Sequence, residues 1–156
     1  MNVVINYKNI NSKKSGINQV LFVDENFNIS KCKNFFFNKE FSFVTDLLKS
    51  KDLKKKFISF DLSSKRKIIL ASIKKDINSW ELENLGGKFF DTFKDSKTNE
   101  FNINSDTLNL KNGVGFFVHG IKLKSYKFDK YKTKKNKKNI KIFVAGKNVP
   151  STNDRL

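Results

Sequence analysis

Residues 67–93 read KIILASIKKDINSWELENLGGKFFDTF, and they are the clearest guide to the fold class. The stretch opens on the short apolar run Lys67–Ala71, whose β-branched residues are typical of a central, buried strand. A polar turn follows, and then Asn78 and Glu81 take the N-cap and N3 positions of a helical capping box. A strand that leads directly into a helix is typical of α/β domains.

The helix that begins near Asn78 has one apolar face and one weak point. Gly86 and Gly87 lie in its interior, where each glycine is less favourable than alanine by roughly 1 kcal/mol. We therefore expect another element to pack tightly against the glycine pair. Four apolar residues share the buried face at helical spacing: Leu82, Leu85, Phe89 and Phe93.

The rest of the chain predicts more strands and helices around this unit. Apolar or alternating runs predict strands at residues 3–5, 19–23, 27–37, 57–60, 101–103 and 140–144. Helical spacing predicts helices at 41–53 and 112–131, the second with Val114, Phe117, Ile121 and Phe128 on its buried side. This alternation of strands and helices predicts an α/β fold, a mixed sheet flanked by helices.

The chain is predicted to hold one folded domain and the start of a linker. A length of 156 residues fits a single domain with a sizeable core, which we place at residues 1–146. Residues 147–156 read KNVPSTNDRL, contain the only proline and show no apolar periodicity. We expect this segment to be a linker toward a further domain that this chain lacks.

The charge balance is strongly basic and has two explanations. Lys and Arg total 32 against 15 Asp and Glu, a formal net charge of +17, which is typical of proteins that bind nucleic acid or acidic membrane surfaces. Only Arg66 and Arg155 are arginines, although arginine is preferred for bidentate contacts to phosphates and bases. Lysine, asparagine, isoleucine and phenylalanine all have A/T-rich codons, so a biased genome accounts for the same excess. Genome bias with a solvated surface is the favoured explanation.

The sequence lacks the features of secreted and membrane proteins. The amino terminus, MNVVINYKN, has no basic segment followed by a long apolar one, as a secretory signal would. No apolar run approaches the ~20 residues of a membrane span. Cys32 is the only cysteine, which excludes an internal disulfide and agrees with a reducing compartment. We therefore expect a cytoplasmic protein without a membrane partner.

Few residues are candidates for catalysis or metal binding. His119 is the only histidine and falls beside the buried stripe of its helix, so we expect a boundary or solvent-facing side chain. Neither an HExxH motif nor paired cysteines occur, and the acidic residues form no cluster, so we expect no metal or cofactor in this chain. Lys31 and Lys33 favour a lower pKa for the Cys32 thiol between them, but an inert thiol is the prediction.

Glycines also occur near the start of the second long helix, at Gly113, Gly115 and Gly120. Their spacing matches neither the dinucleotide fingerprint nor a P-loop. Small residues where a helix crosses a neighbour closely are the favoured explanation. The alternative is a nucleotide-diphosphate site of macro-domain type at Gly113–Phe117, because a helix amino terminus can hold a phosphate.

The densest positive charge lies at residues 122–138, which read KLKSYKFDKYKTKKNKK. A lysine run between a helix and a strand is most often a solvated loop. No RNA-recognition, helix-turn-helix or zinc-finger pattern accompanies the lysines. If the segment does bind nucleic acid, its contacts are predicted to be Tyr131, Lys132, Lys134, Lys135, Lys137 and Lys138.

Within this segment, residues 125–132 read SYKFDKYK and resemble the helix-ending signature of the amino-terminal domain of leucyl (cytosol, M17-type) aminopeptidases. A strand at Lys67–Ile73 followed by a helix containing Leu85-Gly86-Gly87-Lys88 is also similar to the order in that family. Ala71-Ser72-Ile73 departs from the family, which has a glycine-containing turn there. The resemblance covers residues 3–146, and SYKFDKYK is its specific part.

This resemblance implies a macro-domain-like, three-layer α/β sandwich without catalytic activity of its own. Members of the family are two-domain cytosolic exopeptidases that remove amino-terminal residues and assemble as hexamers. Their two divalent metal ions, Zn or Mn, and their catalytic lysine and arginine belong to the carboxy-terminal domain. The resemblance therefore assigns no catalytic or metal-binding residue to this chain. It implies that the partners are the chain's own catalytic domain and other subunits of a homo-hexamer.

The sequence thus supports two functions of different classes. The first is an assembly or regulatory domain of a leucyl aminopeptidase, which is inactive alone. The alternative is a nucleic-acid-binding module that acts through the basic segment 132–138, and the resemblance keeps it open because some relatives bind DNA.

Overall fold

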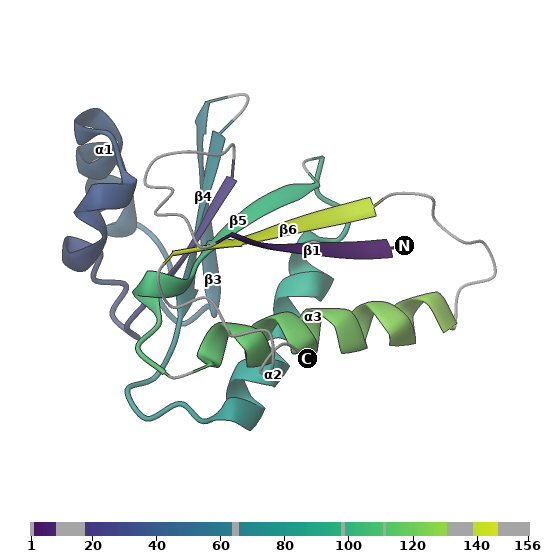
Figure 1. The fold of residues 1–156 in the computed structure, drawn as a ribbon. Coiled ribbons are helices and arrows are strands. Elements are labelled where there is room, and N and C mark those ends of the chain that lie inside the picture. Colours follow the sequence, from purple (N-terminus) through teal and green to yellow (C-terminus); the bar gives the residue numbers. More distant parts are fainter. Residues whose placement is uncertain are drawn as a thin grey trace.

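The computed structural model describes residues 2–8, 18–63, 66–97, 99–110, 112–130 and 139–146, which form one sheet with helices on both faces (Figure 1). The strands are β1 (Asn2–Lys8), β2 (Asn18–Val23), β3 (Phe57–Ser63), β4 (Arg66–Ser72), β5 (Glu100–Asn104) and β6 (Asn139–Ala145). The α-helices are α1 (Asn38–Leu48), α2 (Ser79–Phe93) and α3 (Gly113–Lys130). Two short 3-10 helices are η1 (Ser30–Phe35) and η2 (Ser105–Thr107).

The sheet has the strand order β1-β6-β5-β2-β4-β3. Neighbouring strands run parallel except β3 and β4, which are antiparallel. The sheet is therefore mixed, as predicted. β1 lies at one edge beside β6, in register from Asn2↔Asn139 to Lys8↔Ala145.

Helices cover both faces of the sheet and create two cores. α1 lies on one face, whereas α2 and α3 lie together on the other (Figure 1). Side chains along a strand point alternately to the two faces, and β2 serves both cores in this way. Leu21 and Val23 belong to the core under α1, while Val20 and Phe22 belong to the core under α2 and α3. The predicted three-layer α/β sandwich is confirmed.

The central strands β2 and β4 are covered on both faces, which explains their nearly continuous apolar sequences. Every residue of β2 is buried, and so are the last five residues of β4. The prediction of a central strand at residues 67–71 is therefore confirmed.

α2 begins where the sequence predicts, with the predicted capping box. The Asn78 side chain accepts a hydrogen bond from the Glu81 N–H at 2.9 Å, and the Glu81 carboxylate accepts one from the Asn78 N–H at 3.3 Å. The predicted apolar face is buried against the sheet and α3: Leu82, Leu85, Phe89 and Phe93.

α2 and α3 cross in direct backbone contact through two glycines. A Cβ atom on Gly86 would lie well within 3.0 Å of the Phe117 carbonyl oxygen, and a Cβ on Gly120 would lie equally close to the Glu83 carbonyl oxygen. The tight packing predicted at the glycine pair is therefore present at Gly86, and Gly120 serves a close helix crossing. Gly87 differs, because the nearest atoms would be 3.8 Å from its Cβ, an ordinary van der Waals distance.

The prediction of a strand at residues 27–37 is wrong. Phe27 has a positive φ of 55°, and Ser30–Phe35 form η1. Asp24 Oδ1 accepts hydrogen bonds from the N–H groups of Asn26 and Asn28. Because these local bonds use backbone groups that a strand would need for pairing, the segment forms a turn there. The apolar residues of the stretch still enter the core under α1: Phe27, Ile29, Cys32, Phe35 and Phe36.

The two other predicted helices exist with shifted ends. α1 starts at Asn38 and ends at Leu48, earlier than the predicted range 41–53. α3 is described to Lys130, so Tyr131 lies outside the described residues. Of its predicted buried residues, Val114, Phe117 and Ile121 are buried and Phe128 is half-buried.

Candidate functional site

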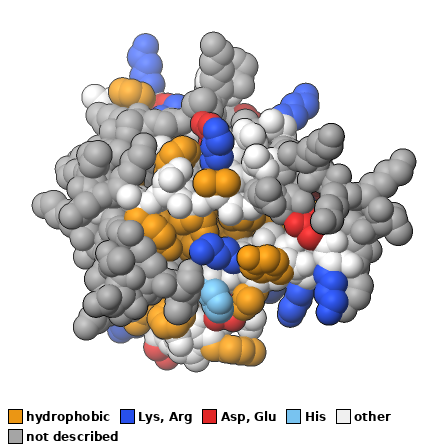
Figure 2. Space-filling view, turned by 45° about the vertical axis from the view of Figure 1, so that its right-hand side comes forward, with side chains coloured by type: hydrophobic (Ala, Val, Ile, Leu, Met, Phe, Trp, Pro, Cys, Tyr) orange, Lys and Arg blue, Asp and Glu red, His pale blue; other side chains and the backbone are white. Residues whose placement is uncertain are grey.

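The surface combines hydrophobic side chains with lysines. Figure 2 shows one face of the molecule on which hydrophobic side chains lie between lysine side chains. Among the described residues, the two most exposed aromatic side chains are Trp80 of α2 at 69% and Tyr126 of α3 at 74%. Exposed aromatic side chains of this kind are typical of surfaces that contact another protein.

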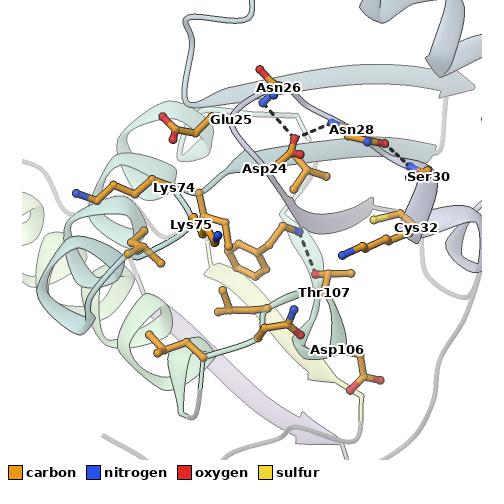
Figure 3. Close-up of a pocket in the computed structure, with 18 of the residues that line it drawn as sticks. Asp24, Glu25, Asn26, Asn28, Ser30, Cys32, Lys74, Lys75, Asp106 and Thr107 are labelled. Atoms are coloured by element: carbon orange, nitrogen blue, oxygen red, sulfur yellow. Dashed lines mark hydrogen bonds between the residues drawn. The ribbon is translucent and has the colours of Figure 1, made fainter.

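A cleft of about 630 Å³ lies at the carboxyl ends of β2, β4 and β5 (Figure 3). Its walls come from the segments that follow these strands and from η1. This volume is in the usual range for small-molecule sites, which is about 300–1,000 Å³. We therefore treat the cleft as the candidate functional site.

The strand connections explain why a cleft forms here. β2 continues toward α1 on one face of the sheet, whereas its neighbour β5 continues toward α3 on the other face (Figure 1). In open α/β sheets, strands whose connections diverge in this way leave a crevice outside their carboxyl ends, and ligands commonly bind there. The register agrees, because β2 and β5 pair at Gln19↔Asn102 and Val20↔Ile103 and then separate.

Thr107 spans the opening between the two strands. Its Oγ1 accepts a hydrogen bond from the Phe22 N–H at 3.0 Å (Figure 3). The same hydroxyl donates a hydrogen bond to the Asn104 carbonyl at 2.7 Å. A side chain thus replaces the strand-to-strand bond that β5 no longer supplies to Phe22. This bridge keeps the end of β2 in place while leaving the cleft open beside it.

The loop after β2 places two carboxylates at the rim. Asp24 Oδ1 accepts the N–H of Asn26 at 3.1 Å and of Asn28 at 2.9 Å (Figure 3). These bonds fix the loop and leave Asp24 Oδ2 without a partner among the described residues. Glu25 is exposed next to it and also lines the cleft.

The loop after β4 places two lysines at the same rim. Lys74 Nζ lies 2.6 Å from Glu81 Oε2, and this hydrogen bond raises the pKa of Lys74 and lowers the pKa of Glu81. Lys75 points into the cleft (Figure 3) and forms no ion pair with an acidic residue in the described part of the chain. Lys74 is therefore already paired with Glu81 of α2, whereas the Lys75 ammonium group can contact a ligand.

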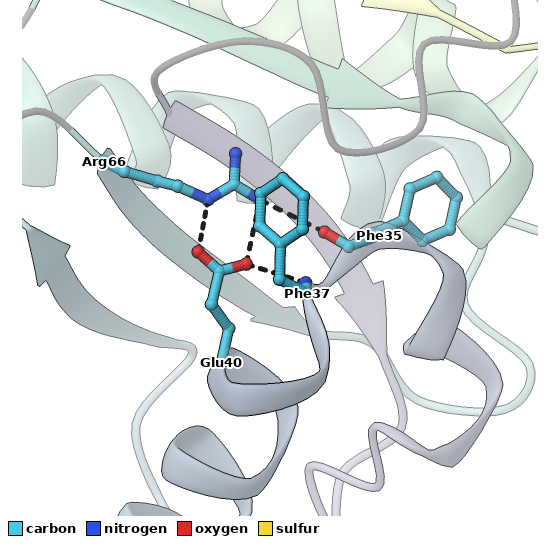
Figure 4. Close-up of polar contacts among 4 residues, drawn as sticks. All are labelled: Phe35, Phe37, Glu40 and Arg66. Atoms are coloured by element: carbon cyan, nitrogen blue, oxygen red, sulfur yellow. Dashed lines mark hydrogen bonds and ion pairs between the residues drawn. The ribbon is translucent and has the colours of Figure 1, made fainter.

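Arg66 stabilises the position of η1, which forms one wall of the cleft. Its Nε lies 2.8 Å from Glu40 Oε2, and its Nη2 donates to the Phe35 carbonyl at 3.3 Å (Figure 4). The same Glu40 carboxylate accepts the Phe37 N–H at 2.9 Å. Arg66 at the start of β4 thus fixes the corner between η1 and α1, so the η1 wall has a defined position relative to the strands.

Cys32 lines this wall and is buried. Burial raises the pKa of its thiol to about 11, because the thiolate is poorly solvated there. The lowering expected from Lys31 and Lys33 is therefore wrong. The high pKa agrees with the predicted inert thiol.

The other candidates from the sequence lie outside the cleft. His119 is half-buried on α3 at 3.1 Å from Glu83 Oε2, which agrees with the predicted boundary position. None of the residues Gly113–Phe117 lines the cleft. A Cβ on Gly113 would come within 2.8 Å of the Leu108 side chain, so the start of α3 is packed beneath the segment that follows β5.

The proposed nucleic-acid contacts fall on residues that the structure does not describe. These are Tyr131, Lys132, Lys134, Lys135, Lys137 and Lys138, and the prediction for them stays a prediction. The described ranges hold no group of three His, Cys, Asp or Glu side chains placed to bind a metal ion. No helix within the same ranges is long and apolar enough to cross a membrane.

Sequence reasoning missed the cleft residues, although a signal was present. Asp24, Glu25, Lys74, Lys75 and Asp106 all follow directly after strands. Polar residues in such positions meet at one edge of a parallel sheet, but only if their strands are neighbours. The strand order that makes β2, β4 and β5 neighbours comes from the structure.

Comparison with known proteins gives likeness in structure only. No model of a known protein family matches the sequence, and no curated protein matches it. A mutant of tomato leucine aminopeptidase is similar over 96% of this chain, with a TM-score of 0.64 and 15% identity. The macrodomain of DarG from Thermus aquaticus is similar over 92% of this chain and 98% of its own, with a TM-score of 0.56 and 9% identity.

The two neighbours differ in how much of each is matched. This chain spans only 34% of the tomato enzyme chain, whereas it matches nearly the whole DarG macrodomain. The chain thus has the fold of a macrodomain, and one part of a leucine aminopeptidase shares that fold.

Proposed function

We propose that this chain is the non-catalytic amino-terminal domain of a cytosolic leucyl aminopeptidase, with an assembly or regulatory role. The observation that carries the proposal is the match of 96% of the chain to 34% of the tomato leucine aminopeptidase chain. On this proposal, residues 1–146 are the domain, and residues 147–156 begin a linker to a catalytic domain that this chain lacks.

The residues that resemble the family signature support the proposal through their position. Ser125–Lys130, the described part of SYKFDKYK, forms the last turns of α3. Ser125 is buried and donates a hydrogen bond to the Lys122 carbonyl at 2.7 Å. The Phe128 ring packs edge-on against Phe90 of α2, with 5.8 Å between centroids. Phe128 of the signature therefore joins the end of α3 to α2, whereas the Ser125 bond lies within α3.

The proposal assigns the chemistry to the missing domain. Two divalent ions, Zn or Mn, do not fit the described residues, which offer no cluster of metal ligands. On this proposal, hydrolysis of the peptide takes place in the carboxy-terminal domain. This chain would contact that domain and other subunits of a homo-hexamer, and the exposed Trp80 and Tyr126 are its candidate contact residues.

The reading frame past the codon for Leu156 tests this proposal. Because the chain spans 34% of the tomato enzyme, we expect the frame to encode about twice as many further residues, rich in Asp and Glu. A stop codon directly after Leu156 would contradict the proposal. In a second test, the isolated chain is assayed on a chromogenic leucyl substrate with Mn²⁺ or Zn²⁺. We expect no turnover above the buffer rate, and turnover by this chain would equally contradict the proposal.

The alternative function, a nucleic-acid-binding module, makes a separate prediction. Binding through Lys132, Lys134, Lys135, Lys137 and Lys138 would make the logarithm of the binding constant fall with the logarithm of the salt concentration. Changing all five lysines to Gln would then weaken binding and flatten this dependence. A slope near zero, or unchanged binding in the five-lysine variant, would remove the alternative.

A further inference from the structure

We infer that the cleft at the ends of β2, β4 and β5 binds a small zwitterion with an apolar side chain, namely an apolar amino acid or a short peptide. This inference depends on the cleft alone. It does not require the proposed parent enzyme, because it is tested by binding to the isolated chain.

The charge balance of the cleft sets it apart from the rest of the protein. The whole chain has 32 basic residues against 15 acidic ones. The cleft instead has three of each, with the acids Asp24, Glu25 and Asp106 and the bases Lys31, Lys74 and Lys75. Lys74 is already paired with Glu81, so the charges left for a ligand are three acids and two lysines. A site of this mixed charge attracts ligands that carry both charges, and it gives a polyanion no net attraction.

The two signs come from different elements at the rim of the cleft. The carboxylates of Asp24 and Glu25 follow β2, and the ammonium group of Lys75 follows the neighbouring strand β4. Among the described residues, neither Asp24 Oδ2 nor Lys75 Nζ has a partner that would compete with a ligand. Asp24 Oδ2 can accept a hydrogen bond from the α-ammonium group of an amino acid, and Lys75 can donate to its carboxylate.

Apolar side chains form the floor of the cleft. Phe22 and Leu108 are 2% exposed, and Ile73 and Ile77 are half-buried beside them. An apolar ligand side chain placed there would be removed from water, which favours its binding. The rim also carries Asn26 and Asn109, whose amides can bond to a peptide group.

A second hollow on the molecule shows what an anion site would look like by contrast. It is lined by Lys55, Lys56 and Lys88 against a single acid, Asp91. Phosphate compounds are expected to prefer such an excess of lysine. In the cleft, they would meet the carboxylates of Asp24 and Glu25 at close range.

The test titrates the whole 156-residue chain with four small molecules. Calorimetry measures the affinity, and the shifts of amide NMR signals show which residues contact the ligand. The probes are leucyl-leucine, glycyl-glycine, N-acetyl-leucine amide and ADP. We expect leucyl-leucine to bind and to shift the amides of residues 22–26 and 73–77. Glycyl-glycine lacks the apolar side chains and N-acetyl-leucine amide lacks both charges, so each should bind at least about tenfold more weakly.

Substitutions separate the cleft from general surface charge. Lys75→Gln and Glu25→Gln should each weaken leucyl-leucine binding about fivefold to tenfold, as loss of a charge-assisted bond predicts. Lys88→Gln removes a lysine from the second hollow and is the matched control, with unchanged binding expected. Three results would each overturn the inference: no binding of leucyl-leucine, equal binding of N-acetyl-leucine amide, or tighter binding of ADP. Equal affinity of the Lys75→Gln and Lys88→Gln variants would also overturn it.

Discussion

Gly120 of α3 rests against the carbonyl oxygen of Glu83 in α2, with no room for a Cβ atom between them. The reciprocal contact, between Gly86 and the Phe117 carbonyl, lies beside it on the same crossing. Two helices that meet backbone to backbone cannot adjust by rotating a side chain. The spacing of α2 and α3 on the sheet is therefore set by these two glycines.

Alanine substitution at this crossing should be strongly destabilising. Gly86→Ala and Gly120→Ala each force a methyl group into a backbone carbonyl, so each should lower the free energy of unfolding by about 2 kcal/mol or more. Gly87→Ala is the matched control in the same helix, where a Cβ has ordinary room. It should raise stability by up to about 1 kcal/mol through helix propensity. Urea unfolding, monitored by circular dichroism, measures the stability of all three variants. Equal changes in stability for the variants at 86 and 87 would contradict the close contact between α2 and α3 at Gly86.

The Arg66–Glu40 pair should contribute more to stability than an exposed pair does. Their side chains are only 13% and 16% exposed, and the carboxylate also holds the Phe37 N–H. Glu40→Gln should cost about 1–3 kcal/mol, because Arg66 loses its charged partner in a partly buried site. Asp46→Asn breaks a pair with Lys49 that is more than three-quarters exposed and should cost less than about 0.5 kcal/mol. Similar losses of stability in the two variants would argue against a role of the Arg66–Glu40 pair in fixing η1 and α1.

Cys32 should be protected from thiol reagents in the folded protein. With a pKa of about 11, roughly one molecule in a thousand carries the thiolate at pH 8, and burial restricts access further. Reaction with a disulfide reagent should therefore be slow in buffer and fast once urea unfolds the chain. Because Cys32 is the only cysteine, the rate reports this site alone. Fast labelling under native conditions would contradict its buried position.

Glu81 should make stability depend on pH in the acidic range below about 4.5. Its pKa is lowered below the ordinary value of 4.5, chiefly by its hydrogen bond with Lys74. The stabilisation is therefore complete above that ordinary value and is lost as the pH falls through the lowered pKa of the folded state. Glu81→Gln keeps a side chain that can complete the capping box but removes the charge. The variant should be less stable than the parent near neutral pH and should converge with it in acid, as urea midpoints across the pH range would show.

The sequence predicts most elements of this fold because their signals are local. The capping pair Asn78 and Glu81 locates the start of α2, and the apolar run at 67–71 identifies β4. The stretch 27–37 misleads because its apolar spacing suits a strand, while Asp24 captures the backbone just before it. A pattern of apolar residues does not reveal such a competition between side chain and backbone.

The cleft could not be predicted because it depends on strand order. Asp24 and Lys75 follow different strands, and only the sheet order makes those strands neighbours. The glycines show the same limit on a smaller scale. Gly86 and Gly87 are adjacent and chemically identical in the sequence, yet only the position of the Phe117 carbonyl distinguishes the essential one.

The pairing of β1 with β6 has a consequence for folding during synthesis on the ribosome. The segment 2–8 leaves the ribosome well before its partner at 139–145, because the rest of the described domain lies between them in the sequence. One edge of the nascent sheet therefore stays incomplete until the β6 segment has emerged, and its exposed amide groups must avoid other chains until then. We expect a polypeptide truncated shortly before residue 139 to aggregate, and its solubility during cell-free synthesis should recover once the final strand is included.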